Sequence, residues 1–348
     1  MSQKNEAPVL ALSLLITFGL IGSGLWLFRE PVSKFFNQTS NPIRSQSLES
    51  SSTGGYAALA EVQGVPDGLF SYGGSTTWAP IRKTLDPVIQ TVWPRFQLRY
   101  TDPTIGAPGS GSGIRMLLAG QLAFSQSSRA LKEEEYQSAL QRGFSLKQIP
   151  VAIDGIAIAV NPSLNLPGVT VAQLKDIYTN QITNWSQVGG PNLPITAYSR
   201  RPEEGGTVEF FVDNVLDGDD FGRNVTFIPT TTEALRQVAT DSGGVYYASA
   251  PEIVPQCTII PLPIGRTAEK MIAPYQAPLV SPDACPAQRN QLNAEAFQNG
   301  DYPITRRLFV IVKQNGQPDQ QAGEAYAELI LTSQAQELLK QAGFVGIR

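Results

Sequence analysis

The sequence predicts an α/β protein, because buried strand patterns and amphipathic helix patterns alternate along it. Short apolar, β-branched runs occur at Val151–Ile153, Ile156–Val160 and Leu308–Val312, and such runs are typical of buried strands in a mostly parallel sheet. Helical patterns lie between runs of this kind, which is the alternation expected of an α/β fold. The length of 348 residues is enough for one large two-lobed domain or two ordinary domains.

Capping residues and apolar spacing indicate where the helices begin and end. Ile114–Ala119 opens one helix, and Thr170–Gln173 is a capping-box start for another. A third helical pattern covers Thr232–Thr240. The last predicted helix runs from about Gln321 to Ala342 and stops at a glycine.

Composition excludes several classes of function. The chain has no histidine, which removes Ser-His-Asp and Cys-His catalysis, the usual zinc sites and His-ligated haem. Its two cysteines cannot build an all-cysteine zinc site or an iron–sulfur cluster. The net charge of -4 gives no bulk attraction for nucleic acid. Binding, or chemistry run by carboxylate, Lys or Tyr side chains, survives these exclusions, and we expect no cofactor, no metal ion and no nucleic-acid partner.

Residues 1–30 predict a membrane anchor or signal segment. An uncharged, mostly apolar run extends from Ala7 to Phe28. A membrane-spanning helix needs about 20 such residues, whereas the apolar core of a signal peptide is usually about 7–15 residues long. We favour an uncleaved anchor over a cleaved signal or a buried core helix. Residues 31–64 are rich in Ser and other polar side chains, so we expect a flexible linker there.

The two cysteines, Cys257 and Cys285, lie in a Pro-rich stretch without the spacing of metal ligands. In an exported domain a structural disulfide is the natural interpretation. Two unpaired buried thiols become the better interpretation only if the domain is cytoplasmic.

Three clusters of Gly, Ser and Thr directly precede helical patterns, at Gly73–Thr77, Gly109–Gly113 and Gly205–Thr207. A helix start presents unpaired N–H groups and a partial positive charge, so three such turns together would cage a small oxyanion. Arg201, just upstream of the third cluster, could hold two oxygens with its planar guanidinium. The alternative is that each cluster is an ordinary helix cap. None of the three matches a nucleotide-binding loop.

The stretches that make the chain recognisable are Gly74–Thr77, Gly109–Gly113, Ser127–Arg129, Asp154–Pro162, Ile182–Pro191, Arg200–Thr207 and Tyr302–Thr305. In this order and spacing the chain resembles, over about residues 68–348, the periplasmic phosphate-binding proteins of the high-affinity phosphate ABC transporter. The resemblance implies a type II periplasmic-binding-protein fold, with two α/β lobes joined by two crossing strands and the ligand in the cleft. Lobe one would comprise residues 65–153 and 305–348, and lobe two residues 154–304.

Carried over residue by residue, the resemblance implies a set of phosphate ligands. They are Thr76 and Thr77 on the first turn, Ser110 on the second, and Arg201, Gly205, Gly206 and Thr207 on the third, with Ser75 and Ser112 as neighbours that share the role. Ser128 would also hold the anion from lobe one. Glu203 is either the acidic partner of the arginine or a solvated loop charge.

Two positions depart from the family's pattern. Ser128 stands where the best-known members have an aspartate that accepts a hydrogen bond from the protonated phosphate. A subgroup of the family, the Ser-for-Asp subgroup, also has serine at this position. Gly205 stands where many members have a serine. Asp154 is a candidate replacement acceptor for the phosphate proton, since it interrupts an apolar strand pattern beside the predicted cleft. The alternative is a structural aspartate bonded to hinge backbone.

The resemblance implies an extracytoplasmic or periplasmic protein that captures inorganic phosphate and delivers it to the permease subunits of an ABC transporter. The N-terminal segment would tether it to the inner membrane. Two alternatives remain open: a binder of another tetrahedral oxyanion such as sulfate, and a tethered phosphate sensor without a transport role. Phosphate-monoester hydrolysis would need a nucleophile with metal ions or an acid–base pair, and no clustered carboxylates suggest one.

Overall fold

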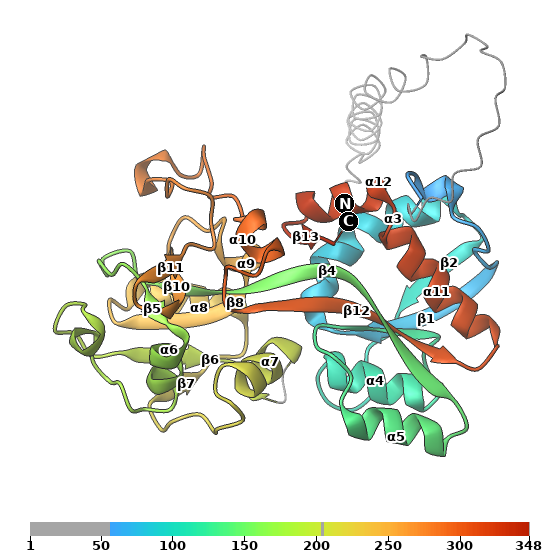
Figure 1. Ribbon diagram of the computed structural model, residues 1–348, viewed down its shortest axis with the longest axis horizontal. Helices are drawn as coiled ribbons and strands as arrows, with labels where there is room; N and C mark the ends of the chain where they lie inside the picture. Colours follow the sequence, from blue (N-terminus) through green and yellow to red (C-terminus); the bar gives the residue numbers. More distant parts are fainter. Residues whose placement is uncertain (1–55, 203–204, 348) are drawn as a thin grey trace, which may run out of the picture. The chain divides into compact units, whose positions relative to one another are not determined.

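The computed structural model describes residues 56–202 and 205–347 (Figure 1). The predicted anchor, and most of the predicted linker, lie outside the described residues. The end of the linker segment is described and includes the short helix η1 (Leu59–Glu61). The Leu59 side chain is fully buried, and its carbonyl accepts a hydrogen bond from Trp93 Nε1 at 3.0 Å. Within residues 56–202 and 205–347, no helix is long and apolar enough to cross a membrane.

A 10-stranded mixed sheet organises the described chain, and its main path has the strand order β2-β1-β3-β12-β4-β8-β6-β7. The strands on this path are β1 (Gly68–Gly74), β2 (Phe96–Tyr100), β3 (Phe124–Ser127), β4 (Ser145–Val160), β6 (Thr196–Ser199), β7 (Val225–Phe227), β8 (Gly244–Ser249) and β12 (Thr305–Gln314). Two further strands, β9 (Ile260–Leu262) and β13 (Val345–Gly346), pair with β4. A separate sheet of three strands joins β5 (Val169–Thr170), β10 (Ile264–Thr267) and β11 (Lys270–Ile272).

The expectation of a mostly parallel sheet is only half right. The pairs β1–β2, β1–β3, β6–β7 and β6–β8 are parallel, but β12 is antiparallel to β3 and β4, and β4 is antiparallel to β8. The predicted strands at 151–153 and 156–160 are parts of one strand, β4, and the predicted strand at 308–312 is part of β12. These segments are largely buried, so their continuous apolar pattern looks like that of a parallel strand.

Helices cover both blocks of parallel strands. They are α3 (Ala79–Val92), α4 (Ser110–Leu118), α5 (Glu133–Gln141), α6 (Val171–Tyr178), α7 (Gly206–Asn214), α8 (Thr231–Thr240), α9 (Ala250–Ile253), α10 (Ala294–Gln298), α11 (Pro318–Ile330) and α12 (Ser333–Gln341), with the 3-10 helices η2 (Thr76–Trp78), η3 (Trp185–Val188) and η5 (Pro282–Ala284).

The predicted capping box of α6 is present, since the Thr170 hydroxyl accepts from the Gln173 N–H at 3.1 Å. The single helix predicted over 321–342 is wrong. The structure has two helices there: α11 ends at Ile330 with Leu331 as its C-cap, and Thr332 caps α12 by accepting from the Ala335 N–H at 3.1 Å.

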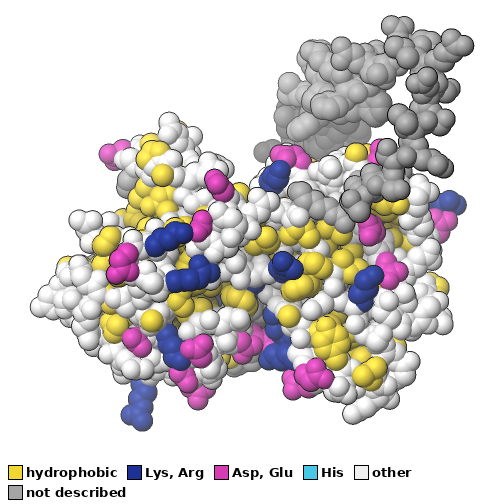
Figure 2. Space-filling model, in the orientation of Figure 1, with side chains coloured by type: hydrophobic (Ala, Val, Ile, Leu, Met, Phe, Trp, Pro, Cys, Tyr) yellow, Lys and Arg dark blue, Asp and Glu magenta, His cyan; other side chains and the backbone are white. Residues whose placement is uncertain are grey.

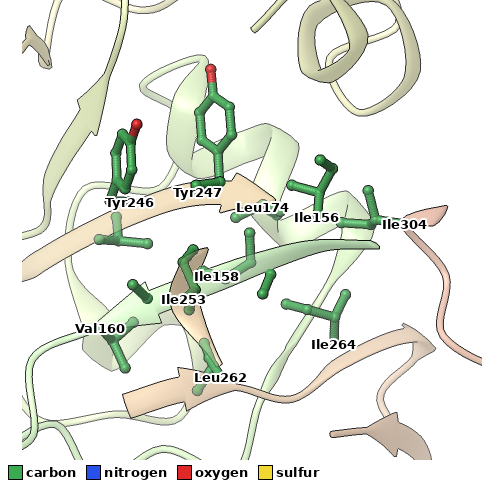
Figure 3. Packing of buried hydrophobic residues seen from close by; sticks show 14 of the residues in the cluster. Ile156, Ile158, Val160, Leu174, Tyr246, Tyr247, Ile253, Leu262, Ile264 and Ile304 are labelled. Carbon is green, nitrogen blue, oxygen red and sulfur yellow. The ribbon is translucent and has the colours of Figure 1, made fainter. Parts of the chain in front are cut away.

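The buried apolar side chains form three clusters. The crossing strands β4 and β12 separate one of these clusters from the other two. One cluster, shown around Ile156, Ile158 and Val160 in Figure 3, is built from residues 156–304 with Val345. The other two are built from residues 59–152 and 308–344. We call the part of the chain that contains residues 59–152 and 308–344 the first lobe, and the part that contains residues 156–304 the second lobe. Figure 1 shows β4 and β12 side by side where the chain passes between the lobes; they pair from Gly155 with Thr305 onward, with a register shift between Leu308 and Phe309.

Cys257 and Cys285 form a disulfide with a Cα–Cα distance of 5.7 Å, which confirms the expected pairing. The bond connects the segment after α9 to the end of η5, both in the second lobe. Charged side chains are dispersed on the face that Figure 2 shows, where Lys and Arg lie among Asp and Glu rather than in a basic stripe.

Candidate functional site

The three helix starts singled out in the sequence meet in space. The first, at η2, and the second, at α4, belong to the first lobe, and the third, at α7, belongs to the second lobe. The hydroxyls of Thr77 and Thr207 are 3.3 Å apart. A Cβ built on Gly109 would lie 3.5 Å from the Gly205 Cα. The turns at Thr76–Thr77, Gly109–Ser110 and Gly205–Thr207 therefore come together between the lobes.

Three buried serines form a cluster beneath these turns. The Ser75 hydroxyl donates to Ser128 Oγ at 2.9 Å, and the hydroxyls of Ser110 and Ser128 are 3.2 Å apart. The Ser128 N–H donates to Ser110 Oγ at 3.0 Å. A Cβ on Gly206 would lie 2.6 Å from both Ser110 Oγ and Ser128 Oγ, so the first residue of α7 packs directly on the cluster. Only glycine fits there.

The backbone conformation at Gly205 favours glycine over serine. Its φ is 154°, a backbone angle that residues with a Cβ rarely adopt. Ser112 lies near the same turns, but its hydroxyl donates to the Gly109 carbonyl at 3.0 Å and so closes its own helix start.

A cavity of about 120 Å³ opens beside the serine cluster. It is lined by Thr76, Thr77, Arg200, Thr207, Val208, Thr231, Tyr246, Tyr247, Ala248 and Glu252. Sites for drug-sized ligands measure about 300–1,000 Å³, so this volume suits a much smaller ligand. Thr76 and Thr77 come from the first lobe and the rest from the second, so a ligand in the cavity can contact both lobes.

Arg306, on the crossing strand β12, is a buried charged residue at the site that sequence analysis missed. Its Nη2 donates to Thr77 Oγ1 at 3.0 Å and to Thr207 Oγ1 at 2.9 Å, and its Nη1 donates to the Gly206 carbonyl at 3.2 Å. The residue is only 4% exposed. A charged residue inside an apolar strand pattern was a usable signal, because the same signal identified Asp154 on the neighbouring strand.

Asp154 is the ion-pair partner of Arg306 and does not line the cavity. Its Oδ2 accepts from Arg306 Nη2 at 2.8 Å and Nε at 3.0 Å, and its Oδ1 accepts from the Ser249 hydroxyl at 2.6 Å. Burial raises the pKa of the Asp154 carboxyl above its usual range, and the Arg306 charge and the Ser249 hydrogen bond oppose that rise. Both oxygens are engaged, which favours the structural role over that of proton acceptor for the anion.

The two adjacent arginines have different places. Arg200 lines the cavity. Arg201, the arginine that the family resemblance implied, is exposed, and its guanidinium carbon lies 5.2 Å from the centre of the Phe227 ring. Glu203, considered as its acidic partner, lies outside the described residues.

The second-lobe wall of the cavity contains further residues that the sequence did not reveal. Tyr247 is buried, its hydroxyl is 2.7 Å from Ser199 Oγ, and burial raises its pKa well above the usual value, so it stays a neutral phenol. Glu252, at the start of α9, is accessible to solvent. Its surroundings still raise its pKa. Desolvation is the largest cause, and the nearby charge of Asp154 is the next. Arg306, Arg200 and hydrogen bonding with Thr231 oppose the rise.

The predicted ligand residues thus divide among three places. Thr76, Thr77 and Thr207 line the cavity described above, and Ser75 and Ser128 lie in the serine cluster. Ser110, Ser112, Gly205 and Gly206 line a second cavity of about 220 Å³ on the other side of the turns. In the part of the chain that the structure describes, no group of three or more His, Cys, Asp or Glu residues could hold a metal ion.

Two α/β lobes, two crossing strands and a small polar cavity lined from both lobes define a binding protein of the type II periplasmic-binding-protein fold. A family model described as a PBP superfamily domain matches residues 60–334, and the chain belongs to that superfamily.

Similar proteins include both curated relatives and solved structures. The chain is 25% identical over 267 residues to the phosphate-binding protein PstS of Staphylococcus epidermidis, which covers 75% of this chain and 76% of that protein. An ABC-type phosphate transport receptor from Vibrio cholerae superposes with a TM-score of 0.61 at 22% identity, over 79% of this chain and 99% of the other. PstS from Borrelia burgdorferi superposes with a TM-score of 0.52 at 19% identity, over 80% and 99%.

Proposed function

We propose that this protein is an extracytoplasmic solute-binding protein that captures inorganic phosphate between its two lobes and delivers it to an ABC transporter. The observation that carries the proposal is the convergence of three Gly/Ser/Thr helix starts, from both lobes, beside a cavity of about 120 Å³. Hydroxyl groups and backbone N–H groups with one or two guanidinium groups suit a small oxyanion. The relatives named phosphate-binding proteins support the choice of phosphate.

The cavity suggests which side chains contact the anion. Thr76 and Thr77 would donate from the first lobe, and Thr207 and Arg200 from the second. Arg306 would contribute its positive charge from behind the two threonines that it already contacts. Ser75, Ser110, Ser112, Ser128, Gly205 and Gly206 would hold the turns that present these groups. Arg201 has no place in this cavity.

Closure of the lobes on the anion follows from the same contacts. A ligand bound to threonines of both lobes stabilises the closed arrangement, because it loses half of its contacts when the lobes separate. The division into residues 65–153 with 305–348 and residues 154–304 belongs to this proposal. So do docking to permease subunits and tethering by residues 1–30.

Isothermal titration of the anion-stripped full-length protein with phosphate tests the proposal. We expect saturable binding of one phosphate per chain. Thr207→Val should weaken it, because the variant removes a hydroxyl from the cavity wall, whereas Thr232→Val, on the exposed face of α8, should not. Absence of phosphate binding by the unmodified protein would contradict the proposed function.

A further inference from the structure

Glu252 is the one acidic residue among the described residues that line the cavity. It lies on the second-lobe wall together with Arg200, Thr231 and the tyrosines Tyr246 and Tyr247. A carboxylate in a wall that binds an anion is unfavourable unless the ligand offers it a proton, since two negative oxygens in contact repel each other. Its presence therefore restricts which oxyanions the cavity accepts.

The local contacts fix Glu252 as an acceptor of hydrogen bonds. The nearby Thr231 hydroxyl lowers the pKa of the Glu252 carboxyl, as a hydrogen-bond donor does, and Thr231 Oγ1 lies 3.2 Å from the Tyr246 hydroxyl. An ionised carboxylate has about four lone-pair positions, so one donor leaves acceptor capacity for a ligand. The carboxylate is accessible to solvent, so a ligand in the cavity can reach it.

The other candidate acceptors are already engaged. Asp154 accepts from Arg306 with one oxygen and from Ser249 with the other. Ser128, in the position of the family's aspartate, is buried in the serine cluster. A hydroxyl also both donates and accepts, so it would bond equally well to a ligand oxygen with or without a proton. Neither residue distinguishes hydrogen phosphate from a fully ionised anion.

We propose that Glu252 accepts a hydrogen bond from the proton of bound hydrogen phosphate and thereby excludes sulfate. This inference rests on the proposed phosphate-binding function. Phosphate retains a proton near neutral pH, whereas sulfate has none to give and would leave the carboxylate facing a negative oxygen without a hydrogen between them. Selectivity then comes from a repulsive contact with the wrong ligand as much as from attraction to the right one.

Glu252→Gln in the full-length protein tests this role, with inorganic phosphate and inorganic sulfate as the two probes. The amide can donate to an unprotonated oxygen, so sulfate affinity should rise and phosphate affinity should fall. Together these changes should reduce the phosphate-to-sulfate ratio by about tenfold to a hundredfold, the effect of one hydrogen bond to a charged group. Glu233→Gln is the matched control, since Glu233 is an exposed residue of α8 that does not line the cavity.

The outcomes separate this inference from the function on which it rests. If the unmodified protein binds phosphate and rejects sulfate, and Glu252→Gln leaves the ratio unchanged, the role of Glu252 is overturned and the phosphate-binding function stands. Equal affinity of the unmodified protein for both anions also overturns it. If the unmodified protein binds neither anion, the proposed function fails, and the inference with it.

A second measurement does not depend on the folding of a variant. Lowering the pH in the unmodified protein protonates Glu252, and the neutral carboxyl can then donate to sulfate, so sulfate binding should appear as the pH falls. The ionisable groups that act on Glu252 are Asp154, Arg306 and Arg200. Asp154 is already bonded at both oxygens, to Arg306 and to Ser249. If sulfate affinity does not change as the pH is lowered into the range in which an ordinary glutamate titrates, the proposal is contradicted.

Discussion

At the scale of single residues, the most important contact at the site is the ion pair between Arg306 and Asp154. Both side chains are almost fully buried, and Arg306 also donates to one threonine of each lobe. A buried charge is costly without its partner, so the two residues must be considered together. The two residues are paired on adjacent crossing strands, and Arg306 therefore connects these strands to threonines that line the cavity.

Arg306→Met should lower the free energy of unfolding by about 3–5 kcal/mol, because it leaves the Asp154 carboxylate buried and unpaired. The double variant Arg306→Met with Asp154→Leu should recover much of that loss, since it removes the second charge as well. Urea unfolding monitored by circular dichroism measures both. A loss of under about 1 kcal/mol in the single variant would show that the pair is of little importance to stability.

Gly206→Ala should weaken phosphate binding without a comparable loss of fold stability. The added Cβ would lie 2.6 Å from both Ser110 Oγ and Ser128 Oγ, so the second-lobe turn must move away from the first lobe. Gly111→Ala is the control, because its Cβ would lie 3.4 Å from a flexible arginine end, Arg115 Nη1. Titration calorimetry with phosphate compares the two, and equal affinities would refute the close approach at Gly206.

At the scale of elements, α7 is connected to the first lobe by ion pairs as well as by its first turn. Glu209 Oε1 lies 2.9 Å from Arg129 Nε and 3.1 Å from Lys132 Nζ. Arg129 is itself held by Glu135, with an Nη2–Oε1 distance of 2.8 Å. These contacts join the lobes only while α7 lies against the first lobe, so they favour the closed arrangement.

Glu209→Gln should weaken phosphate binding a few-fold at low salt, since a partly exposed pair contributes up to about 1 kcal/mol. The difference from the unmodified protein should shrink as salt is added, because ions screen the pair. Asp217→Asn is the control, as it breaks an ion pair with Lys175 within the second lobe. An effect of Glu209→Gln that does not depend on salt would argue against an electrostatic contribution to closure.

Short-range sequence rules predicted where helices begin better than they predicted how the helices and strands are connected and packed. The capping box at Thr170 and the three Gly/Ser/Thr helix starts are short-range features, and each does begin a helix. The break at Thr332 was missed because apolar residues continue through it at helical spacing. That Arg200 rather than Arg201 lines the cavity could not be predicted, because it depends on the direction in which the backbone leaves β6, which spacing along the chain does not reveal. Glu252 and Tyr247 reach the site only through the tertiary fold.

At the scale of the whole molecule, the two lobes share the long strands β4 and β12, and both contribute residues to the lining of the cavity. A lobe cannot unfold alone without removing a partner from the crossing strands and part of the lining of the cavity. Anything that binds only the folded state stabilises it by mass action. Ligand specificity can therefore be measured by shifts in thermal stability as well as by binding.

Phosphate should raise the melting temperature of the full-length protein in a single transition, since neither lobe keeps its ligand contacts alone. At a free concentration of about 100 times the dissociation constant the stabilisation should be about 2.7 kcal/mol. Sulfate at the same concentration should shift the melting temperature little, beyond the general effect of salt, and Glu252→Gln should respond to both anions. Differential scanning calorimetry measures the shifts. Two resolved transitions, with phosphate moving only one of them, would mean that the anion is held by a single lobe and that closure across the crossing strands is not how this protein retains it.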